Sequence, residues 1–215
     1  MSITASDIAK LRAQTGAGMM DCKQALEECG GDAEKAVEWL RKKGITKAAK
    51  RAGKVAAEGV VASYIHGGGK VGVLVEVNCE TDFVAKTDAF KALVGDIALH
   101  IAAVNPRYVS RSEVPGALVE KEKNVHREQL LTEKKPAEMI EKIVEGKMGR
   151  FYSEICLLEQ PFIKDEDKTI EQLLTEKTGE TGEKITVRRF ARFELGEGIE
   201  KQASDFAAEV AEQLK

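Results

Sequence analysis

Early in the chain, apolar residues follow a helical spacing. In residues 3–44 they recur every three or four positions, which predicts three short helices separated by glycines. We expect Thr4 or Ser6 to cap the first helix and Asp32 the third, because their side-chain oxygens accept free N–H groups of a first turn. The third helix should end near Lys43. The expected inward residues of this three-helix bundle are Ile8, Leu11, Met19 or Met20, Ala25, Leu26, Ala36, Val37, Trp39 and Leu40.

A basic stretch follows the bundle. Residues 41–54 carry seven Lys or Arg and no acidic residue. They form either a solvated helical linker or a contact with an acidic partner surface or with RNA. No aromatic residue lies among these charges to stack on bases, which argues against single-stranded RNA. We therefore expect a basic linker over residues 45–58.

The spacing then becomes strand-like. Two β-rich runs, residues 59–66 and 70–78, flank Gly67-Gly68-Gly69. Glycine adopts the positive φ of tight turns, so the pattern predicts a β-hairpin. A glycine-rich turn binds phosphate where it opens a helix; this one connects two strands, so we exclude a phosphate loop. His66 lies at the tip, where a solvated side chain and a partner contact are both open.

The residues after the second strand have the character of a helix start. Thr81 and Asp82 are residue types that cap helices, and Phe83 follows them in a polar neighbourhood. The ring either folds back onto the sheet or stands out from the turn as an anchor for a partner. Position alone favours the first alternative, because most aromatic residues are buried.

A second cap, Thr87-Asp88, begins a longer helix. It should end at Asn105-Pro106, because the residue before a proline disfavours helical backbone. Its apolar stripe should pack against the hairpin. His100 lies off this stripe and is expected at the surface or at an edge. The stripe consists of Phe90, Leu93, Val94, Ile97, Ala98, Ile101 and Ala102.

Residues 115–156 are dense in Glu and Lys and have a single apolar seam. Two helical segments begin at Pro115 and Pro136, a residue type that helices accept in their first turn, and residues 132–135 separate them. The pattern predicts an antiparallel helical hairpin that partly protrudes, as a brace or as an interaction lever. Its apolar residues are Leu118, Val125, Leu130 and Leu131, then Met139, Ile140, Ile143, Val144, Met148, Phe151, Tyr152 and Ile155.

The remaining pattern predicts one more strand. Residues 169–174 should form a short helix and residues 178–183 a polar loop, after which residues 184–195 alternate with a period of two. This strand is expected to pair with the hairpin and complete a three-stranded antiparallel sheet. Residues 203–214 should form a last helix. One face of the sheet should stay open for self-association and carry Arg188, Phe190 and Arg192.

These elements predict an α+β fold: a three-helix bundle, then a three-stranded antiparallel sheet packed with helices, with a protruding antiparallel helical hairpin. The expected division is 1–44 for the N-terminal bundle, 45–58 for the basic linker, 59–114 for the core hairpin and helix, 115–156 for the helical hairpin, 157–200 for the core strand and its connections, and 201–215 for the C-terminal helix.

Composition narrows the class of protein. The 215 residues carry a net charge of −3, with 32% charged and 43% hydrophobic residues, so neither a general affinity for polyanions nor a direct nucleic-acid partner is expected. No apolar run is long enough to span a membrane, and residues 1–5 lack the regions of a signal peptide. The four cysteines have no C-x-x-C spacing and should be reduced thiols, which indicates the cytoplasm or an organelle matrix.

The sequence contains no nucleotide loop, no metal-binding His-Glu helix and no nucleophile elbow. Cys22 and Cys29 share a helix face, but no further ligand completes a zinc set. Cys79, Asp82 and His100 are the residue types of a thiol triad, but nothing in their spacing requires the three side chains to meet. We therefore expect a binding or regulatory protein that is not an enzyme and needs no cofactor.

Two long motifs and a shorter one carry a family resemblance. TGAGMMDCKQAL at residues 15–26, EVNCETDFVAK at residues 76–86 and FELGEGIEK at residues 193–201 resemble the elongation factor Ts family. The similarity extends from about Ile3 to the C-terminus. It implies a guanine-nucleotide exchange factor for elongation factor Tu in translation elongation. Asp82 and Phe83 match the pair that presses against the G domain of that partner beside its nucleotide. The region implied in displacing the partner's Mg²⁺ is Thr81, Asp82, Phe83 and Val84.

The resemblance implies further contacts. The N-terminal bundle is similar to ubiquitin-associated domains and should dock on the G domain, with Leu11, Met19 and Met20 at contact positions. The helical hairpin resembles the coiled-coil module of the family, and the last helix resembles another G-domain contact. His66 and Gly67 resemble residues that touch domain 3 of elongation factor Tu.

The chain departs from the long bacterial form of the family, which carries two related sheet-and-helix subdomains, because only one is present here. Residues 64–67 resemble the contact of the second subdomain, whereas residues 81–83 resemble that of the first. Shorter members of the family form homodimers through their sheets, which agrees with the expected open face. We predict a homodimer that engages two partner molecules.

Three other functions remain open on the sequence. The N-terminal bundle could be a ubiquitin-type binding module, the linker could bind RNA, and Cys79 could serve a thiol enzyme. A partner screen with residues 1–54, the salt dependence of RNA affinity, and the effect of Cys79→Ser would separate them.

Overall fold

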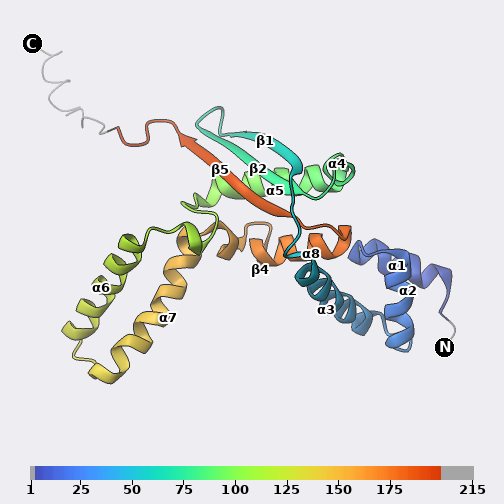
Figure 1. Cartoon of the computed structure of the whole chain (residues 1–215), viewed down its shortest axis with the longest axis horizontal. Helices are drawn as coiled ribbons and strands as arrows, with labels where there is room; N and C mark the ends of the chain where they lie inside the picture. The colour runs from blue at the N-terminus through green and yellow to red at the C-terminus, as the bar shows by residue number, and fades with distance from the viewer. Residues whose placement is uncertain (1–2, 200–215) are drawn as a thin grey trace, which may run out of the picture.

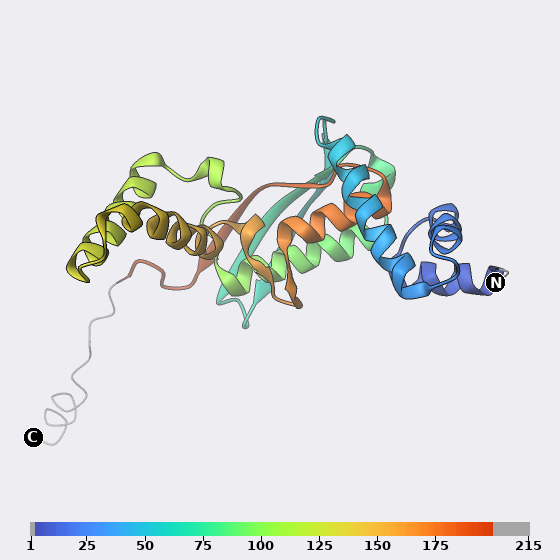
Figure 2. The ribbon, with the colours of Figure 1, turned by 90° about the horizontal axis from the view of Figure 1, so that it is seen from below.

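The computed structural model describes residues 3–199 and has the predicted α+β fold (Figure 1). A central sheet separates two projections, the helical N-terminal bundle and a helical hairpin, which extend from opposite ends of the sheet in both views (Figure 2). The last helix that we expected, residues 203–214, lies outside the described residues.

The N-terminal bundle consists of Ala5–Thr15 (α1), Met19–Glu28 (α2) and Ala33–Arg51 (α3). Thr4 caps α1, and its Oγ1 accepts the Asp7 backbone N–H at 3.3 Å. Asp32 caps α3 in the predicted way. The buried core of the bundle is Leu11, Cys22, Ala25, Leu26, Ala36 and Leu40.

The third helix continues well beyond Lys43, where we expected its end. Gly44 is helical and marks a crossing with a later helix, where a Cβ placed on Gly179 would lie 2.8 Å from Gly44 Cα. The glycine therefore permits close helix packing instead of ending the helix. As a result, α3 includes most of the basic stretch, up to Arg51.

The predicted three-stranded antiparallel sheet is confirmed. Its strands are Glu58–His66 (β1), Val71–Cys79 (β2) and Thr186–Glu194 (β5), in the order β1-β2-β5. The central strand β2 ends where residues 82–85 form a single helical turn, Asp82–Ala85 (α4). Helix Asp88–Val104 (α5) covers one face of the sheet and ends at Asn105, as expected, where this residue adopts a left-handed conformation with φ of 55°.

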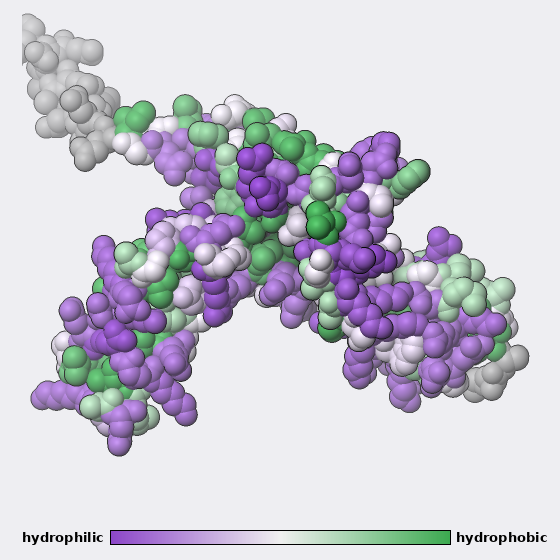
Figure 3. Space-filling view, viewed as in Figure 1, coloured by the Kyte–Doolittle hydropathy of each residue, from purple (hydrophilic) through white to green (hydrophobic). Residues whose placement is uncertain are grey.

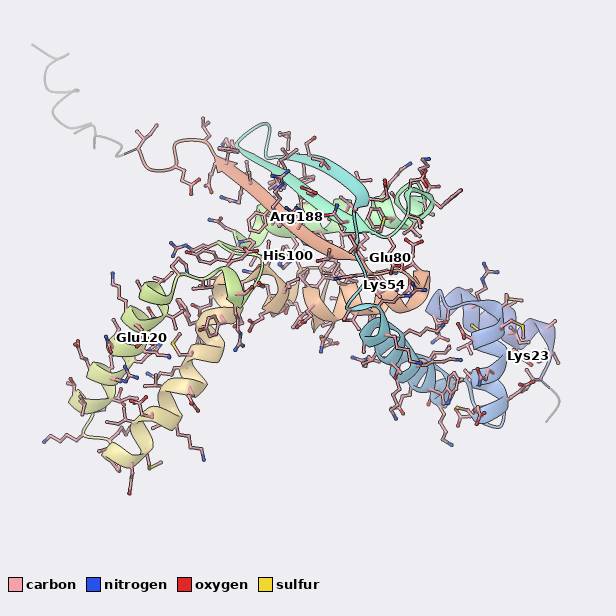
Figure 4. All side chains as sticks on the ribbon, viewed as in Figure 1. Lys23, Lys54, Glu80, His100, Glu120 and Arg188 are labelled. Carbon is pink, nitrogen blue, oxygen red and sulfur yellow. The ribbon has the colours of Figure 1, made fainter. Side chains whose placement is uncertain are left out.

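His100 is fully buried, so the expectation of a surface position was wrong. Its Nε2–H donates to Gln160 Oε1 at 3.0 Å, and its Nδ1 accepts the Ile163 backbone N–H at 3.3 Å. Burial lowers the pKa of His100, which keeps the imidazole neutral. The cause is a segment around residue 160 that packs over this side of α5, which the periodicity of α5 alone does not reveal (Figure 4).

The helical hairpin, which we call the arm, consists of Gly116–Thr132 (α6) and Ala137–Ile155 (α7), as predicted. Its seam buries Leu130, Ile140, Val144 and Met148. Arg127 on α6 donates to both carboxylate oxygens of Glu141 on α7, at 2.7 and 3.0 Å. Two short 3-10 helices, Arg111–Glu113 (η1) and Leu157–Glu159 (η2), connect the arm to the sheet region.

The segment between the arm and β5 is more ordered than we expected. Pro161–Phe162 (β3) and Asp165–Thr169 (β4) pair as a small second sheet that the sequence did not predict. Helix Ile170–Thr181 (α8) occupies much of the expected polar loop, because a capping box at Thr169 begins it and Gly182, with φ of 74°, ends it. Thr178 is buried, and its Oγ1 accepts the Ile185 backbone N–H at 3.1 Å.

A bulge in β5 overturns the predicted composition of the open sheet face. Val187 pairs with Val77 and Arg189 with Glu76, so Arg188 is an extra residue that reverses the alternation after it. Phe190 therefore packs against the core, and Arg192 Nε donates to Ala102 O at 3.2 Å. Arg188, Phe190 and Arg192 do not share one open face.

The face of the sheet away from α5 carries other apolar side chains instead. The strand pairs place Leu74 beside Ala191, and Ile65 and Phe193 on either side of Gly72, while Val61 of β1 completes the five apolar side chains of this face. All five side chains are exposed, and we call this surface the open face. Figure 3 shows apolar surface over the sheet, in contrast to the mostly polar N-terminal bundle.

Candidate functional site

The most unusual surface of the described residues is the turn between β2 and α5, residues 79–87, which we call the Phe83 turn. Thr81 caps α4, and its Oγ1 accepts the Val84 backbone N–H at 3.5 Å. Thr87 caps α5, and its hydroxyl donates to Val84 O at 2.8 Å. Ala85 is buried in the main core. The short helix is therefore fixed at both ends and from below.

Phe83 projects from this turn into solvent with 80% of its surface exposed. The alternative that its position favoured, a ring folded back onto the sheet, was therefore wrong. The turn offers one face to the core through Ala85 and the other to solvent through Phe83. An exposed aromatic ring on a fixed backbone is typical of a site that anchors a partner protein.

Asp82 places a negative charge beside the exposed ring. The Lys86 ammonium donates to its carboxylate, and this hydrogen bond lowers the pKa of Asp82. The group is thus ionised at neutral pH while it remains accessible. The Phe83 turn combines an apolar ring with an adjacent charge.

Two carboxylates from distant parts of the chain hold the turn. Glu183 Oε2 accepts the Thr81 backbone N–H at 3.0 Å, and Glu183 Oε1 accepts the Thr81 hydroxyl at 2.6 Å. Glu80 Oε1 in turn accepts the Lys184 backbone N–H at 2.7 Å. Sequence reasoning missed Glu183, because no spacing pattern connects it to a residue 102 positions earlier.

The three expected contact residues of the N-terminal bundle differ in exposure. Met19 and Met20, at the start of α2, expose 44% and 73% of their surface. Leu11 exposes only 2% because it faces the interior of the bundle. Its side chain is thus not available on this surface, and the expectation that it touches a partner directly does not fit the structure.

His66 and Gly67 lie at the other end of the sheet from the Phe83 turn. The pairing of β1 with β2 runs from Glu58 opposite Cys79 to His66 opposite Val71. Strands advance about 3.4 Å per residue, so the hairpin tip and the turn are roughly 27 Å apart. His66 is exposed, and its Nδ1 is hydrogen-bonded to Tyr64 Oη at 2.9 Å. One copy of the chain therefore presents these two surfaces at opposite ends.

The structure does not bring together Cys79, Asp82 and His100, the three residues of the thiol triad considered from the sequence. Cys79 is buried, its pKa is raised by burial, and its thiol donates to Thr81 O at 3.1 Å. His100 uses both ring nitrogens on Gln160 and Ile163, as described above, while Asp82 pairs with Lys86 at the surface. The arrangement does not support a thiol nucleophile.

The part of the chain that the structure describes, residues 3–199, contains no cluster of three or more His, Cys, Asp or Glu that could bind a metal ion. Nor does any helix within it have the length and apolar character needed to cross a membrane.

Several cations of the basic stretch are engaged within the chain. Lys43 and Lys47 bind the two oxygens of Asp21 at 3.1 and 2.6 Å, and Arg51 binds Glu80 Oε2 at 3.0 Å. These pairs attach α3 to α2 and to the Phe83 turn. They favour a structural role for these three residues over RNA binding.

Comparison with known proteins agrees with the motifs in this site. The family model described as "Elongation factor TS" matches residues 8–197. Elongation factor Ts of Desulforamulus reducens is 61% identical over 213 residues, covering 99% of this chain and 98% of that protein. The Carboxydothermus hydrogenoformans protein of that name is 60% identical with the same coverage, and that of Geobacter sulfurreducens is 61% identical over 98% of both chains. With its two long motifs inside the matched range, this chain belongs to the elongation factor Ts family.

Proposed function

We propose that this protein is a guanine-nucleotide exchange factor for elongation factor Tu in translation elongation, and that it works in the cytoplasm. Its action is binding, without covalent chemistry of its own. The observation that carries the proposal is Phe83, an exposed ring on a turn fixed at both ends, in a chain of the elongation factor Ts family.

An exchange factor must bind the nucleotide-free partner better than the GDP-bound partner, since only a difference in affinity shifts the equilibrium. Phe83 and Asp82 meet this requirement if they enter the G domain beside the nucleotide. A buried aromatic ring removes about 150–250 Å² from water. The free energy gained by burying this area is available only in the complex, because the ring is exposed in the free protein.

The proposed target is the partner's site for Mg²⁺ and phosphate. Residues 81–84 would displace the segments of the G domain that hold the ion, with Thr81 and Val84 supporting Asp82 and Phe83. Mg²⁺ neutralises phosphate charge, so weaker coordination weakens GDP binding. Each loss of about 1.4 kcal/mol accelerates release tenfold if the barrier falls equally.

The N-terminal bundle would provide a second contact with the G domain through Met19 and Met20. Methionine side chains are flexible and polarisable, so they adapt to an irregular surface. Both residues are exposed at the start of α2, and the bundle and α4 project from the same end of the sheet (Figure 1). Two linked contacts raise each other's effective concentration.

A homodimer would complete the assembly. The apolar open face supports this proposal, because exposed apolar patches of this kind mark protein interfaces. Residues Val61, Ile65, Leu74 and Phe193 take the place of the Arg188, Phe190 and Arg192 surface that we expected. The dimer would engage two molecules of elongation factor Tu, with His66 and Gly67 as contacts to domain 3.

Release of a fluorescent GDP analogue from elongation factor Tu tests the proposal. The protein should accelerate release in the presence of Mg²⁺. With Mg²⁺ removed by a chelator, release should become fast without the factor, and the factor should add little. Failure to accelerate release with Mg²⁺ present would contradict the exchange function, and full acceleration after chelation would contradict the Mg²⁺ part alone.

A further inference from the structure

Glu183 accepts hydrogen bonds from both donors of Thr81, its backbone N–H and its side-chain hydroxyl. It lies two residues after the end of α8, while Thr81 caps α4 more than a hundred residues earlier, so the contact joins two segments far apart in the chain. The carboxylate accepts the hydrogen bond that the Thr81 hydroxyl donates. The same hydroxyl oxygen keeps a lone pair that faces the Val84 N–H inside the short helix.

Glu80 completes a reciprocal arrangement. It belongs to the Phe83 turn and accepts the backbone N–H of Lys184, the neighbour of Glu183. Its other oxygen binds Arg51 at the end of α3, and Lys184 Nζ donates to Ala52 O at 2.7 Å and to Lys54 O at 3.1 Å. Figure 4 shows Glu80 and Lys54 together where α3 ends beside the sheet. We call Glu80 and Glu183 with these partners the carboxylate clasp.

The short helix α4 depends on such external support. A single helical turn is unstable by itself, because nucleation costs more conformational entropy than one hydrogen bond returns. Phe83 lies in solvent, so its own side chain contributes little to fixing the turn. The position of the ring is therefore set by Ala85 below it and by the cap that Glu183 holds.

We infer that Glu183 is a positioning residue of the exchange reaction, and that the carboxylate clasp holds Asp82 and Phe83 in the geometry that enters the partner. This inference rests on the proposed function of the Phe83 turn. Glu183 acts through Thr81 and does not itself touch the G domain. A ring whose backbone is already fixed loses less conformational freedom on binding. More of the free energy of its contact with the partner is then available to weaken GDP binding.

The inference requires a specific kinetic pattern. Removal of the carboxylate leaves Met19, Met20 and the rest of the docking surface in place, so the concentration of factor for half-maximal effect should change little. The maximal rate of GDP release should fall, because the ring reaches its position in only a fraction of the complexes. Glu183→Gln keeps one acceptor oxygen and should give an intermediate rate.

The test is a double-mutant cycle on the full chain. GDP release from elongation factor Tu is measured with wild type, Glu183→Ala, Phe83→Ala and the double variant. Glu176→Ala serves as the matched control, because this α8 carboxylate binds Lys168 at 2.9 Å, away from the turn. We expect Glu183→Ala to lower the maximal rate about fivefold, the control to leave it unchanged, and the double variant to be no slower than Phe83→Ala.

Each other outcome decides the matter. If Glu183→Ala slows release equally with and without Phe83, its effect is general and the inference is overturned. If Phe83→Ala slows release and Glu183→Ala does not, the inference fails while the proposed role of the turn stands. If Phe83→Ala leaves release unchanged, the role of the turn fails, and the inference fails with it.

Discussion

Phe83 and His100 lie at opposite extremes of exposure, and each extreme has a physical cause. Phe83 stands out because Ala85 and the two threonine caps fix the backbone beneath it. His100 is accommodated in the core because both ring nitrogens have hydrogen-bond partners. The first side chain is available for a partner, and the second stabilises the junction between α5 and the segment that follows the arm.

The stability of the protein should depend on pH through His100. Burial lowers the pKa of His100 from its usual value of 6.5. Below that pH the unfolded chain binds a proton that the folded chain resists, so the free energy of unfolding falls, by up to about 1.4 kcal/mol per pH unit. Above it His100 is neutral in both states and contributes no pH dependence. Urea unfolding at about pH 7.5 and about pH 5.5 measures the difference.

A pair of variants isolates this effect. His100→Gln should lose this part of the pH dependence, whatever its absolute stability, because the titrating group is gone. His66→Gln at the exposed hairpin tip should retain it. The assignment to His100 would be wrong if His100→Gln kept the same pH dependence as the wild type.

The sequence was informative about single residues only where the decisive neighbours are close in the chain. Thr81 and Thr87 were recognised as caps because a cap and its helix are adjacent. The burial of His100 and the contact of Glu183 with Thr81 were not predicted, since the hydrogen-bond partners of these residues lie 60 and 102 positions away. A single sequence has no local pattern that reports such contacts.

At the scale of elements, the relation between α3 and α8 determines how the N-terminal bundle joins the rest. The two helices cross at Gly44 and Gly179 with their backbones in close contact. Asp21, Lys43 and Lys47 then bind α3 to α2 on the bundle side. The crossing thereby sets where Met19 and Met20 lie relative to the Phe83 turn.

The two glycines should respond differently to alanine. A Cβ on Gly179 would lie 2.8 Å from Gly44 Cα and 3.2 Å from Gly44 O, so α3 and α8 must separate. We expect Gly179→Ala to lower the free energy of unfolding by about 1–3 kcal/mol. A Cβ on Gly44 meets Gly179 Cα at 3.9 Å, an ordinary contact, so Gly44→Ala should stabilise the helix by up to about 1 kcal/mol.

Guanidinium unfolding of both variants beside the wild type measures this difference. Gly44→Ala is the matched control, since the substitution is chemically identical and lies at the same crossing. Equal effects of the two substitutions would show that the close approach of the backbones does not limit the packing of these helices.

The sequence predicted most elements but not the irregularities between them. Amphipathic stripes and caps located α5, the arm and the hairpin, because each has a period of its own. The bulge at Arg188 was not predictable, since one extra residue in a strand leaves the alternation on each side of it intact. Its consequence was large, because Phe190 and Arg192 moved to the covered face.

At the scale of the whole molecule, the proposed contacts are distributed over both ends of the sheet. The N-terminal bundle and the Phe83 turn project from one end, and the hairpin tip and the arm lie towards the other (Figures 1 and 2). A separation of roughly 27 Å between the turn and the tip is the length of the central strands. The open face between them is the surface available for a second copy of the chain.

The mass in solution tests the homodimer. Light scattering after size exclusion should give twice the chain mass of 23.5 kDa for the wild type. Phe193→Asp should reduce the mass to that of one chain, because a charge buried in an apolar interface lacks a partner. Leu131→Asp, at an exposed position of the arm, should leave the dimer intact. A wild-type monomer, or a dimer unaffected by Phe193→Asp, would contradict the proposed interface.

The same measurement with elongation factor Tu determines the assembly. Two partner molecules for each pair of chains are expected if each copy presents its own Phe83 turn. A complex of one chain with one partner would show that the dimer separates on binding.

GDP release from elongation factor Tu in the presence of Phe83→Ala tests the central claim most directly. The exposed ring adds little to folding, so the free energy of unfolding of the variant should stay within about 0.5 kcal/mol of the wild-type value. We predict that it accelerates GDP release at least about tenfold less than the wild type, which corresponds to about 1.4 kcal/mol of lost contact. Leu131→Ala, an exposed apolar residue on the arm, should behave as wild type. Unchanged GDP release with Phe83→Ala would contradict the role assigned to the turn.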